Sequence, residues 1–147
     1  MKNIFTAIVL LISITIYSQS KKDYTFSYNT DSILSNGLRN YYKENYQGAI
    51  SEYKKISKYD DKYLVAQYEM SLALSASGNK QELRKLLEEL YEKGLMKEKP
   101  ILYTSYGNFL SDEKEYDKAE KIFNEGAVYL SNSSNFLYNQ AILYLRK

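Results

Sequence analysis

Cysteine, histidine and tryptophan are absent from this 147-residue sequence, and proline occurs once, at Pro100. Without cysteine the chain can form neither a disulfide nor a thiolate site. Without histidine it lacks the commonest general base and the commonest metal ligand, so nucleophilic sites of the Ser–His and Cys–His types are excluded. Any catalysis would depend on carboxylates, lysine, tyrosine or serine.

The charged residues are nearly balanced, with 20 Lys and Arg against 18 Asp and Glu. The two signs alternate along the chain, which gives no basic patch for nucleic acid. Three acidic pairs occur, at 60–61, 88–89 and 112–113. Neighbouring residues on a helix point about 100° apart and do not converge on one substrate atom. We therefore expect caps and solvated faces rather than an enzyme, and no metal, phosphate-loop or dinucleotide motif indicates a cofactor.

The N-terminus has the pattern of a secretory signal peptide. Lys2 precedes an apolar run from Ile4 to Tyr17, and Ser18-Gln19-Ser20 offers small residues for cleavage. The run is shorter than the ~20 residues of a membrane span. We predict a signal at 1–18, with cleavage possible after 20, and an exported protein, periplasmic or secreted, with no stable span after cleavage. An uncleaved membrane anchor is the alternative.

After the signal, residues 19–29 are polar and aromatic without a helical period, and we expect an extended lead-in. The rest of the chain has no hairpin signal and repeated helical periodicity, which predicts an all-α fold. Asn45 and Asn79 are expected N-caps, and Gly78 and Gly94 are expected helix ends. The predicted helices cover about 31–43, 46–58, 62–77, 80–93, 100–111, 115–130 and 135–146.

The predicted helices form pairs with a repeating pattern of small and large residues. Gly37 lies twelve residues before Ala49, and Gly107 lies twelve before Ala119. The two copies are 70 residues apart, about two periods of 34 to 36, and Leu83 and Leu87 belong to a copy between them. Repetition at this period is typical of helical solenoids, in which neighbouring pairs bury each other's apolar faces.

These residues resemble the pattern of tetratricopeptide-repeat proteins of an exported bacterial type. With repeats starting at Thr30, Leu64 and Pro100, three positions of the family's pattern can be compared. Position 8, usually small, holds Gly37, Ser71 and Gly107. Position 20, usually small, holds Ala49, Leu83 and Ala119, with Leu83 larger than usual. Position 24, usually aromatic, holds Tyr53, Leu87 and Phe123. The resemblance implies a solenoid over 30–147, with three pairs and a C-terminal capping helix. A fourth start at Ser134 would pack Leu137, Ala141 and Tyr144 on the third pair.

The resemblance also implies a binding surface on the first helix of each pair. In this family, positions 5, 9 and 12 line a concave groove where a protein or peptide partner lies. The predicted partner-binding residues are Leu34, Leu38, Tyr41, Tyr42, Tyr68, Leu72, Asn108 and Tyr138, and the same stripe includes Ser75, Thr104 and Ser111. Leu34 and Leu38 occupy the positions of the family's carboxylate-binding Lys and Asn, so a terminal carboxylate is not the expected ligand. The alternative is that residues 21–29 cover Leu34, Leu38 and Tyr42.

The function that we expect from the sequence is binding, by a non-catalytic scaffold in the bacterial cell envelope. One alternative is a structural subunit packed permanently into an envelope assembly. A carboxylate-based hydrolase is a further alternative, for which the sequence offers only the acidic pairs. The sequence does not identify the partner.

Overall fold

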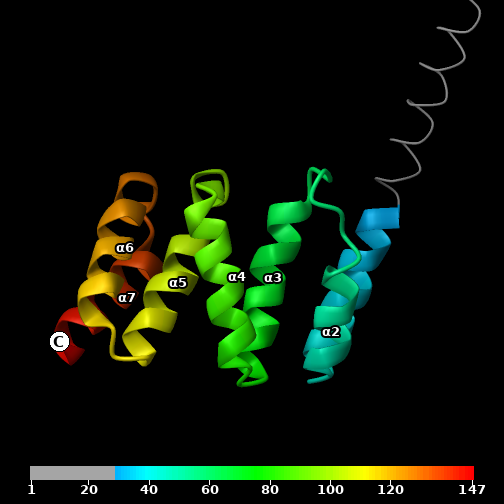
Figure 1. Ribbon diagram of the computed structural model, residues 1–147, viewed down its shortest axis with the longest axis horizontal. Coiled ribbons are helices and arrows are strands. Elements are labelled where there is room, and N and C mark those ends of the chain that lie inside the picture. Colours follow the sequence, from blue (N-terminus) through cyan, green and yellow to red (C-terminus); the bar gives the residue numbers. More distant parts are fainter. Residues whose placement is uncertain (1–28) are drawn as a thin grey trace, which may run out of the picture.

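The computed structural model describes residues 29–147, and this part of the chain is entirely helical, with no strand (Figure 1). The expected all-α fold is confirmed for these residues. The predicted signal and residues 19–28 of the lead-in lie outside them; Asn29, the last lead-in residue, is already helical. The helices are a first helix at 29–42, α2 (Tyr46–Tyr53), α3 (Tyr63–Ala76), α4 (Lys80–Glu92), the 3-10 helix η1 (Leu95–Lys97), α5 (Ile101–Asp112), α6 (Tyr116–Leu130) and α7 (Ser134–Arg146).

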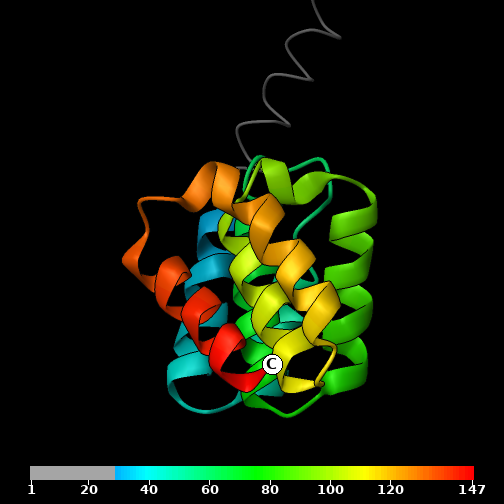
Figure 2. The same ribbon diagram turned by 90° about the vertical axis from the view of Figure 1, so that its left-hand side faces the viewer.

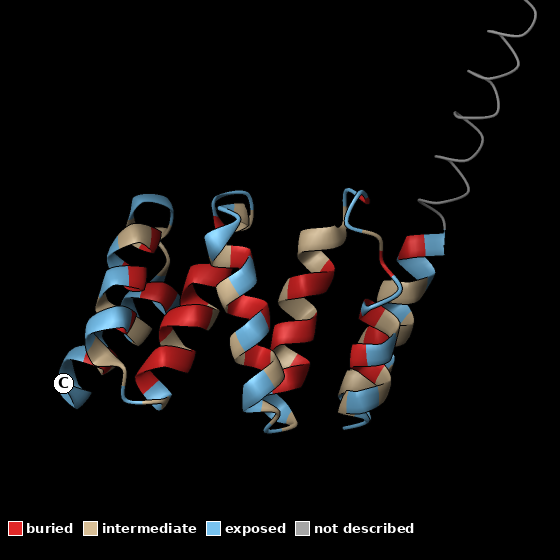
Figure 3. Cartoon of the chain, viewed as in Figure 1, coloured by how far each residue is buried: buried red, intermediate tan, exposed pale blue. Residues whose placement is uncertain are grey.

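From right to left in Figure 1, α2 to α6 follow one another in chain order, and α7 lies behind α6, in contact with both α6 and α5. Contacts join neighbours such as α5 and α6, and also helices two apart, such as α3 with α5 and α5 with α7. Figure 2 looks from the C-terminal end, which α6 and α7 cover. Buried residues lie on the faces between helices, and α5 is buried along most of its length (Figure 3). No helix within 29–147 is long and apolar enough to cross a membrane.

The predicted small positions hold large rings against the helix backbone. A Cβ added at Gly37 would lie 2.3 Å from the Tyr53 ring, and one added at Gly107 would lie 2.7 Å from the Phe123 ring. Both rings are fully buried. Between these two pairs, Ser71 and Leu87 are also buried. Position 8 of the predicted pattern therefore contacts the ring at position 24, sixteen residues later, in both the first and the third pair.

Three turns between paired helices share one hydrogen-bonded geometry. The second residue after each first helix has a positive φ: 59° at Glu44, 70° at Gly78 and 62° at Lys114. In each turn the following N–H bonds a carbonyl five residues back, as in a Schellman motif. These bonds are Asn45 to Asn40 (2.9 Å), Asn79 to Leu74 (3.0 Å) and Glu115 to Leu110 (2.8 Å). The turns are 34 and 36 residues apart, the same spacing as the predicted repeats.

The second predicted helix is shorter than expected, since α2 ends at Tyr53 rather than near Lys58. Asp60 explains the early end, because it ties the following turn to two elements. Its Oδ2 accepts a hydrogen bond from the Thr30 hydroxyl (2.5 Å), and its Oδ1 accepts one from the Lys62 N–H (2.8 Å). Ile56 is buried in the same turn. These contacts favour a turn over another helical turn.

The predicted buried face of the last helix is wrong by one residue. Leu137, Ala141 and Tyr144 are exposed, whereas Phe136 and Leu143 are fully buried. The Phe136 ring meets Phe123 edge-on at 5.6 Å between centroids. Ser133 caps the helix by accepting a hydrogen bond from the Phe136 N–H, so the fourth copy of the pattern starts one residue earlier than Ser134.

Candidate functional site

A groove of about 400 Å³ opens between α3, α5 and α7. These helices are separated along the chain by α4 and α6, so residues far apart in sequence meet here. The wall from α3 is partly aromatic and aliphatic, and the walls from α5 and α7 carry hydroxyls and carboxamides. The side chains that define it are Tyr68, Leu72, Ser75, Ile101, Thr104, Ser105, Asn108, Asp112, Asn135 and Asn139, with Lys80 and Glu113 at one end. We refer to it as the α3–α5–α7 groove.

The structure brings three of the eight predicted partner-binding residues into this groove: Tyr68, Leu72 and Asn108. Ser75, Thr104 and Ser111, from the same predicted stripe, lie close by: the first two line the groove and Ser111 is buried at the end of α5. Helical spacing places these residues on one stripe, because side chains four apart share a face, and the choice of that stripe came from the family resemblance.

The other five predicted residues lie elsewhere. Leu34, Leu38 and Tyr41 are half-buried on the first helix, and Leu34 and Tyr41 pack against the core. Tyr42 is 81% exposed and meets the Tyr41 ring edge-on. None of these four lines the α3–α5–α7 groove, which begins at α3. Tyr41 also meets Tyr46 edge-on, so part of its ring packs against α2 rather than facing a groove.

Tyr138 is 65% exposed on α7 and does not line the groove. The helix contributes Asn135 and Asn139 instead, two residues four apart that the sequence analysis did not select. A one-residue shift on a helix rotates a side chain by about 100°. The misplaced start of the fourth repeat does not by itself account for the omission, because a start at Ser133 places Leu137, Ala141 and Tyr144 at positions 5, 9 and 12. Phe136 was the available signal for the rotation of α7, but the predicted stripe in that register still does not include the two asparagines.

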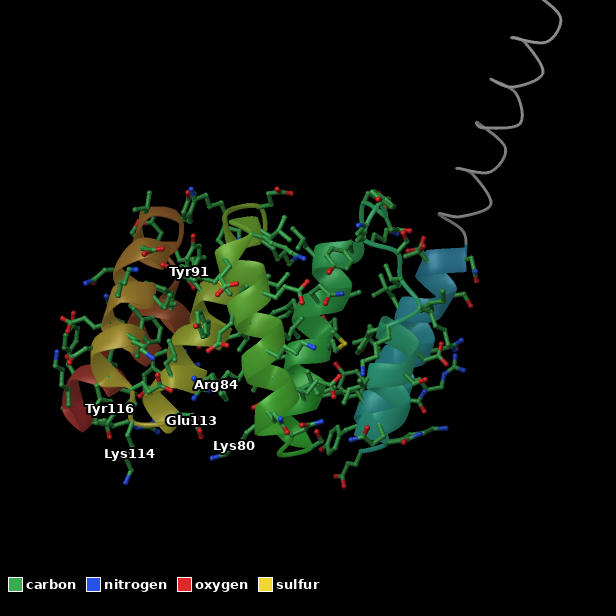
Figure 4. The ribbon with its side chains drawn as sticks, in the orientation of Figure 1. Lys80, Arg84, Tyr91, Glu113, Lys114 and Tyr116 are labelled. Atoms are coloured by element: carbon green, nitrogen blue, oxygen red, sulfur yellow. The ribbon has the colours of Figure 1, made fainter. Side chains whose placement is uncertain are left out.

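All charged groups at the end of the groove are paired. Lys80 Nζ donates to Glu113 Oε1 (2.7 Å), and that bond raises the pKa of Lys80. Arg146 donates to Asp112 Oδ1 (2.6 Å) and to the Ser111 hydroxyl (3.3 Å). Figure 4 shows Lys80, Arg84 and Glu113 close together at the same end of α4 and α5. Arg84 lies 3.8 Å from Glu113, donates to Glu115 (2.5 Å) and stacks on Phe109, which lines the groove.

The neutral polar groups of the groove differ in how they are satisfied. The Ser71 hydroxyl donates to the Tyr68 carbonyl (2.7 Å), and the Asn139 amide donates to the Asn135 carbonyl (2.7 Å) and to its side-chain oxygen (2.9 Å). Thr104 is different, because its buried hydroxyl has no hydrogen-bond partner among residues 29–147. Burial raises the pKa of Tyr68, with Glu69 and Tyr41 adding to the effect, so its phenol stays protonated in neutral solution.

The acidic pairs have structural partners rather than each other. Asp60 holds Thr30, Glu88 pairs with Arg84, Glu89 pairs with Lys93 and Asp112 pairs with Arg146. Within the described part of the chain no group of three or more acidic side chains could hold a metal ion. The groove therefore offers hydrogen bonds and apolar contact, and its acids are already engaged.

A second surface feature lies at the C-terminal end, where large apolar side chains of α6 and α7 are exposed. They are Val128, Tyr129, Leu137, Tyr138, Tyr144 and Leu145. Single exposed apolar residues are common on protein surfaces. Several on one helix are less common and can mark an interaction surface. On α7 they share the face opposite Phe136 and Leu143.

Comparisons of the chain with protein-family models, with curated proteins and with solved structures found no match.

Proposed function

We propose that this chain is a non-catalytic helical-repeat module of the tetratricopeptide type, and that it binds an extended segment of a partner protein in the α3–α5–α7 groove. The groove carries the proposal, because three helices separated along the chain supply its walls. The proposed solenoid is supported by the small residues that oppose large rings and by the three equivalent turns.

The chemistry of the groove suits a peptide. Tyr68, Leu72 and Ile101 give apolar contact with a phenol hydroxyl at hand, and tyrosine is well suited to anchoring contacts. The groove's volume of about 400 Å³ is within the roughly 300–1,000 Å³ of small-ligand sites. It can hold a short stretch of chain rather than a folded domain.

The proposed location is the bacterial cell envelope, with the chain exported to the periplasm or secreted. The support is the N-terminal pattern of Lys2, the apolar run to Tyr17 and the small residues after it. The intact mass of the protein from the envelope should correspond to a start at Gln19 or Lys21. A species that keeps Met1 in the membrane fraction would contradict this proposal.

A permanently assembled subunit is the second candidate function. The exposed apolar side chains of α6 and α7 favour it, because such a face is costly to leave in water when several large residues adjoin. Sedimentation of the exported protein at micromolar concentration separates the two functions. A soluble monomer supports the transient binder, and a fixed complex after gentle purification supports the subunit.

Peptide selection tests the binding function directly. Displayed random dodecapeptides are selected on the exported protein, and a selected peptide is mapped by amide chemical shifts. We expect shifts around Tyr68, Leu72 and Asn108. Leu72→Lys should abolish binding, because it places a charge and a long side chain inside the groove. Leu145→Lys is the matched control, since Leu145 is 82% exposed outside it. Binding by Leu72→Lys at full affinity would contradict the proposed site.

A further inference from the structure

We infer that the α3–α5–α7 groove selects an extended peptide segment without net charge, read through its main chain and one large apolar side chain. The inference rests on the proposed function and adds the chemical class of the ligand. Its evidence is the pairing of charges at the groove, the carboxamides of two walls and the buried hydroxyl of Thr104.

Among the described residues, the groove has no cation free to receive an anion. Lys80 is the one basic residue among its lining side chains, and it already donates to Glu113. A carboxylate or phosphate entering the groove would lose its hydration without gaining an unpaired partner, and Asp112 and Glu113 would repel it. Burying a charge without a partner is costly. Acidic and phosphorylated segments should therefore bind in this groove more weakly than neutral ones.

The acids at the groove are also engaged, so a basic segment gains little. Asp112 is held by Arg146, and Glu113 is held by Lys80 with Arg84 nearby. A lysine on the ligand would have to compete with these existing ion pairs. Exposed ion pairs contribute little because water screens them, so such an exchange adds little affinity. The expected order of affinity is neutral first, basic second and acidic last.

The carboxamides match the needs of a peptide main chain. An extended segment has unpaired N–H and C=O groups, and an asparagine side chain offers both a donor and an acceptor. Asn108 on α5 and Asn135 on α7 face the groove from two walls. Asn139 uses its amide N–H groups within α7, which leaves its side-chain oxygen to accept from a ligand N–H.

Thr104 supplies an independent sign of a ligand. Its side chain lines the groove and is 5% exposed, and its hydroxyl has no partner among the described residues. A buried polar group without a partner is unfavourable. A rotation of this side chain toward a peptide in the groove would give the hydroxyl a main-chain partner.

The test uses three acetylated and amidated nonapeptides with the exported protein. All three carry Leu or Tyr at alternate positions, and the positions between carry Ser, Glu or Lys. Calorimetry at physiological salt measures affinity, and amide chemical shifts locate the bound peptide. We expect the Ser peptide to bind in the groove, the Lys peptide within about threefold of it, and the Glu peptide at least about tenfold more weakly, which is about 1.4 kcal/mol.

Variants then separate the groove from the fold. Thr104→Val keeps the shape of the side chain without its hydroxyl, so it should weaken the Ser peptide severalfold without lowering the melting temperature. Tyr53→Phe is the control, because it removes the other buried hydroxyl that lacks a partner, outside the groove. Asn108→Ala should also weaken binding, and Asn132→Ala, in the exposed turn after α6, should not.

Two results would overturn different conclusions. A Glu peptide that binds in the groove as tightly as the Ser peptide would overturn the selection for neutral segments and leave the peptide-binding function standing. Failure of all three peptides at millimolar concentration, or shifts confined to another surface, would overturn the proposed function itself.

Discussion

The first and third helix pairs both pack a glycine of the first helix against a ring of the second helix, and the two rings differ by one hydroxyl oxygen. Gly37 receives Tyr53 in the first pair, and Gly107 receives Phe123 in the third. Both rings are fully buried, but the Tyr53 hydroxyl has no hydrogen-bond partner among the described residues. The Phe123 ring also meets Phe136 from the following helix. The glycine at the shared position makes room for a six-membered ring. The residues around the ring decide whether a hydroxyl on it finds a hydrogen-bond partner.

Gly107→Val should have the largest effect, with a loss of about 3 kcal/mol or more. The first new carbon would lie 2.7 Å from the Phe123 ring, which Phe136 prevents from moving aside. Gly37→Val is the comparison. Its first new carbon would lie 2.3 Å from the Tyr53 ring, but within 29–147 no aromatic ring stacks on Tyr53, so this ring can move aside and the loss should be smaller. Urea denaturation followed by circular dichroism gives both values. Equal losses would show that the two rings are equally confined.

Exchanging the two rings should give effects of opposite sign. Phe123→Tyr buries a hydroxyl on the ring edge that faces Gly107 and should lose about 1–3 kcal/mol. Tyr53→Phe removes an unsatisfied hydroxyl and should be neutral or stabilising by up to about 1 kcal/mol. The urea midpoints of the two variants measure the difference. A clear loss in Tyr53→Phe would mean that the hydroxyl is bound, by water or by a partner, in solution.

The turns after the first helices also differ from one another, and substitutions in them should change the stability less than those at the rings. Gly78 adopts its positive φ without a side-chain penalty, whereas Glu44 and Lys114 adopt it as ordinary residues. Lys114→Gly and Glu44→Gly should each stabilise the protein by about 0.5–1 kcal/mol, and Gly78→Ala should destabilise it by about 1 kcal/mol. Thermal melts of the three variants test this. No gain in Lys114→Gly would indicate that the lysine makes a compensating contact.

The smallest difference is expected only in alkali. Burial raises the pKa of Tyr53, with Glu69 adding to it, and burial raises the pKa of Tyr106 to about 12. A phenol whose folded pKa lies above its unfolded value of about 10 contributes stability that is present below pH 10 and lost as the pH rises through the folded pKa. Urea midpoints should be constant from pH 7 to 9 and fall between pH 10 and 12.

Tyr53→Phe should reduce this alkaline loss without abolishing it, because Tyr106 still titrates. The two proteins should therefore differ more at pH 11 than at pH 8. Absorbance of tyrosinate at each pH, measured in the folded protein, reports the ionisation directly. A decline that is identical with and without Tyr53 would assign the alkaline loss to the remaining tyrosines.

The sequence predicted the helix ends correctly where the capping residue and its hydrogen-bond partner are only a few positions apart. Asn45 and Asn79 cap α2 and α4 through their side-chain oxygens, and Gly78 and Gly94 have the left-handed conformation expected at helix ends. These outcomes depend on hydrogen bonds between residues only a few positions apart. The predicted bounds of most helices therefore agree with the observed ones within two residues.

The groove could be predicted only in part, since its walls come from three separate helices. The stripe on α3 and α5 supplied Tyr68, Leu72 and Asn108. Asn135 and Asn139 depended on the rotation of α7, which the contact between Phe136 and Phe123 sets. The spacing of residues within α7 cannot predict how the helix is rotated about its axis, because that rotation depends on a contact with another helix.

For residues 29–147, the sequence by itself determined the all-helical fold, the pairing of the helices and the small residues that receive large rings. Those features depend on periodicity and on residue size, which are properties of the chain alone. The tertiary structure decided the end of α2, through Asp60 and Thr30, and the orientation of α7. It also decided which charges at the groove are neutralised, because the ion pairs of Lys80 with Glu113 and Arg146 with Asp112 join residues more than thirty positions apart.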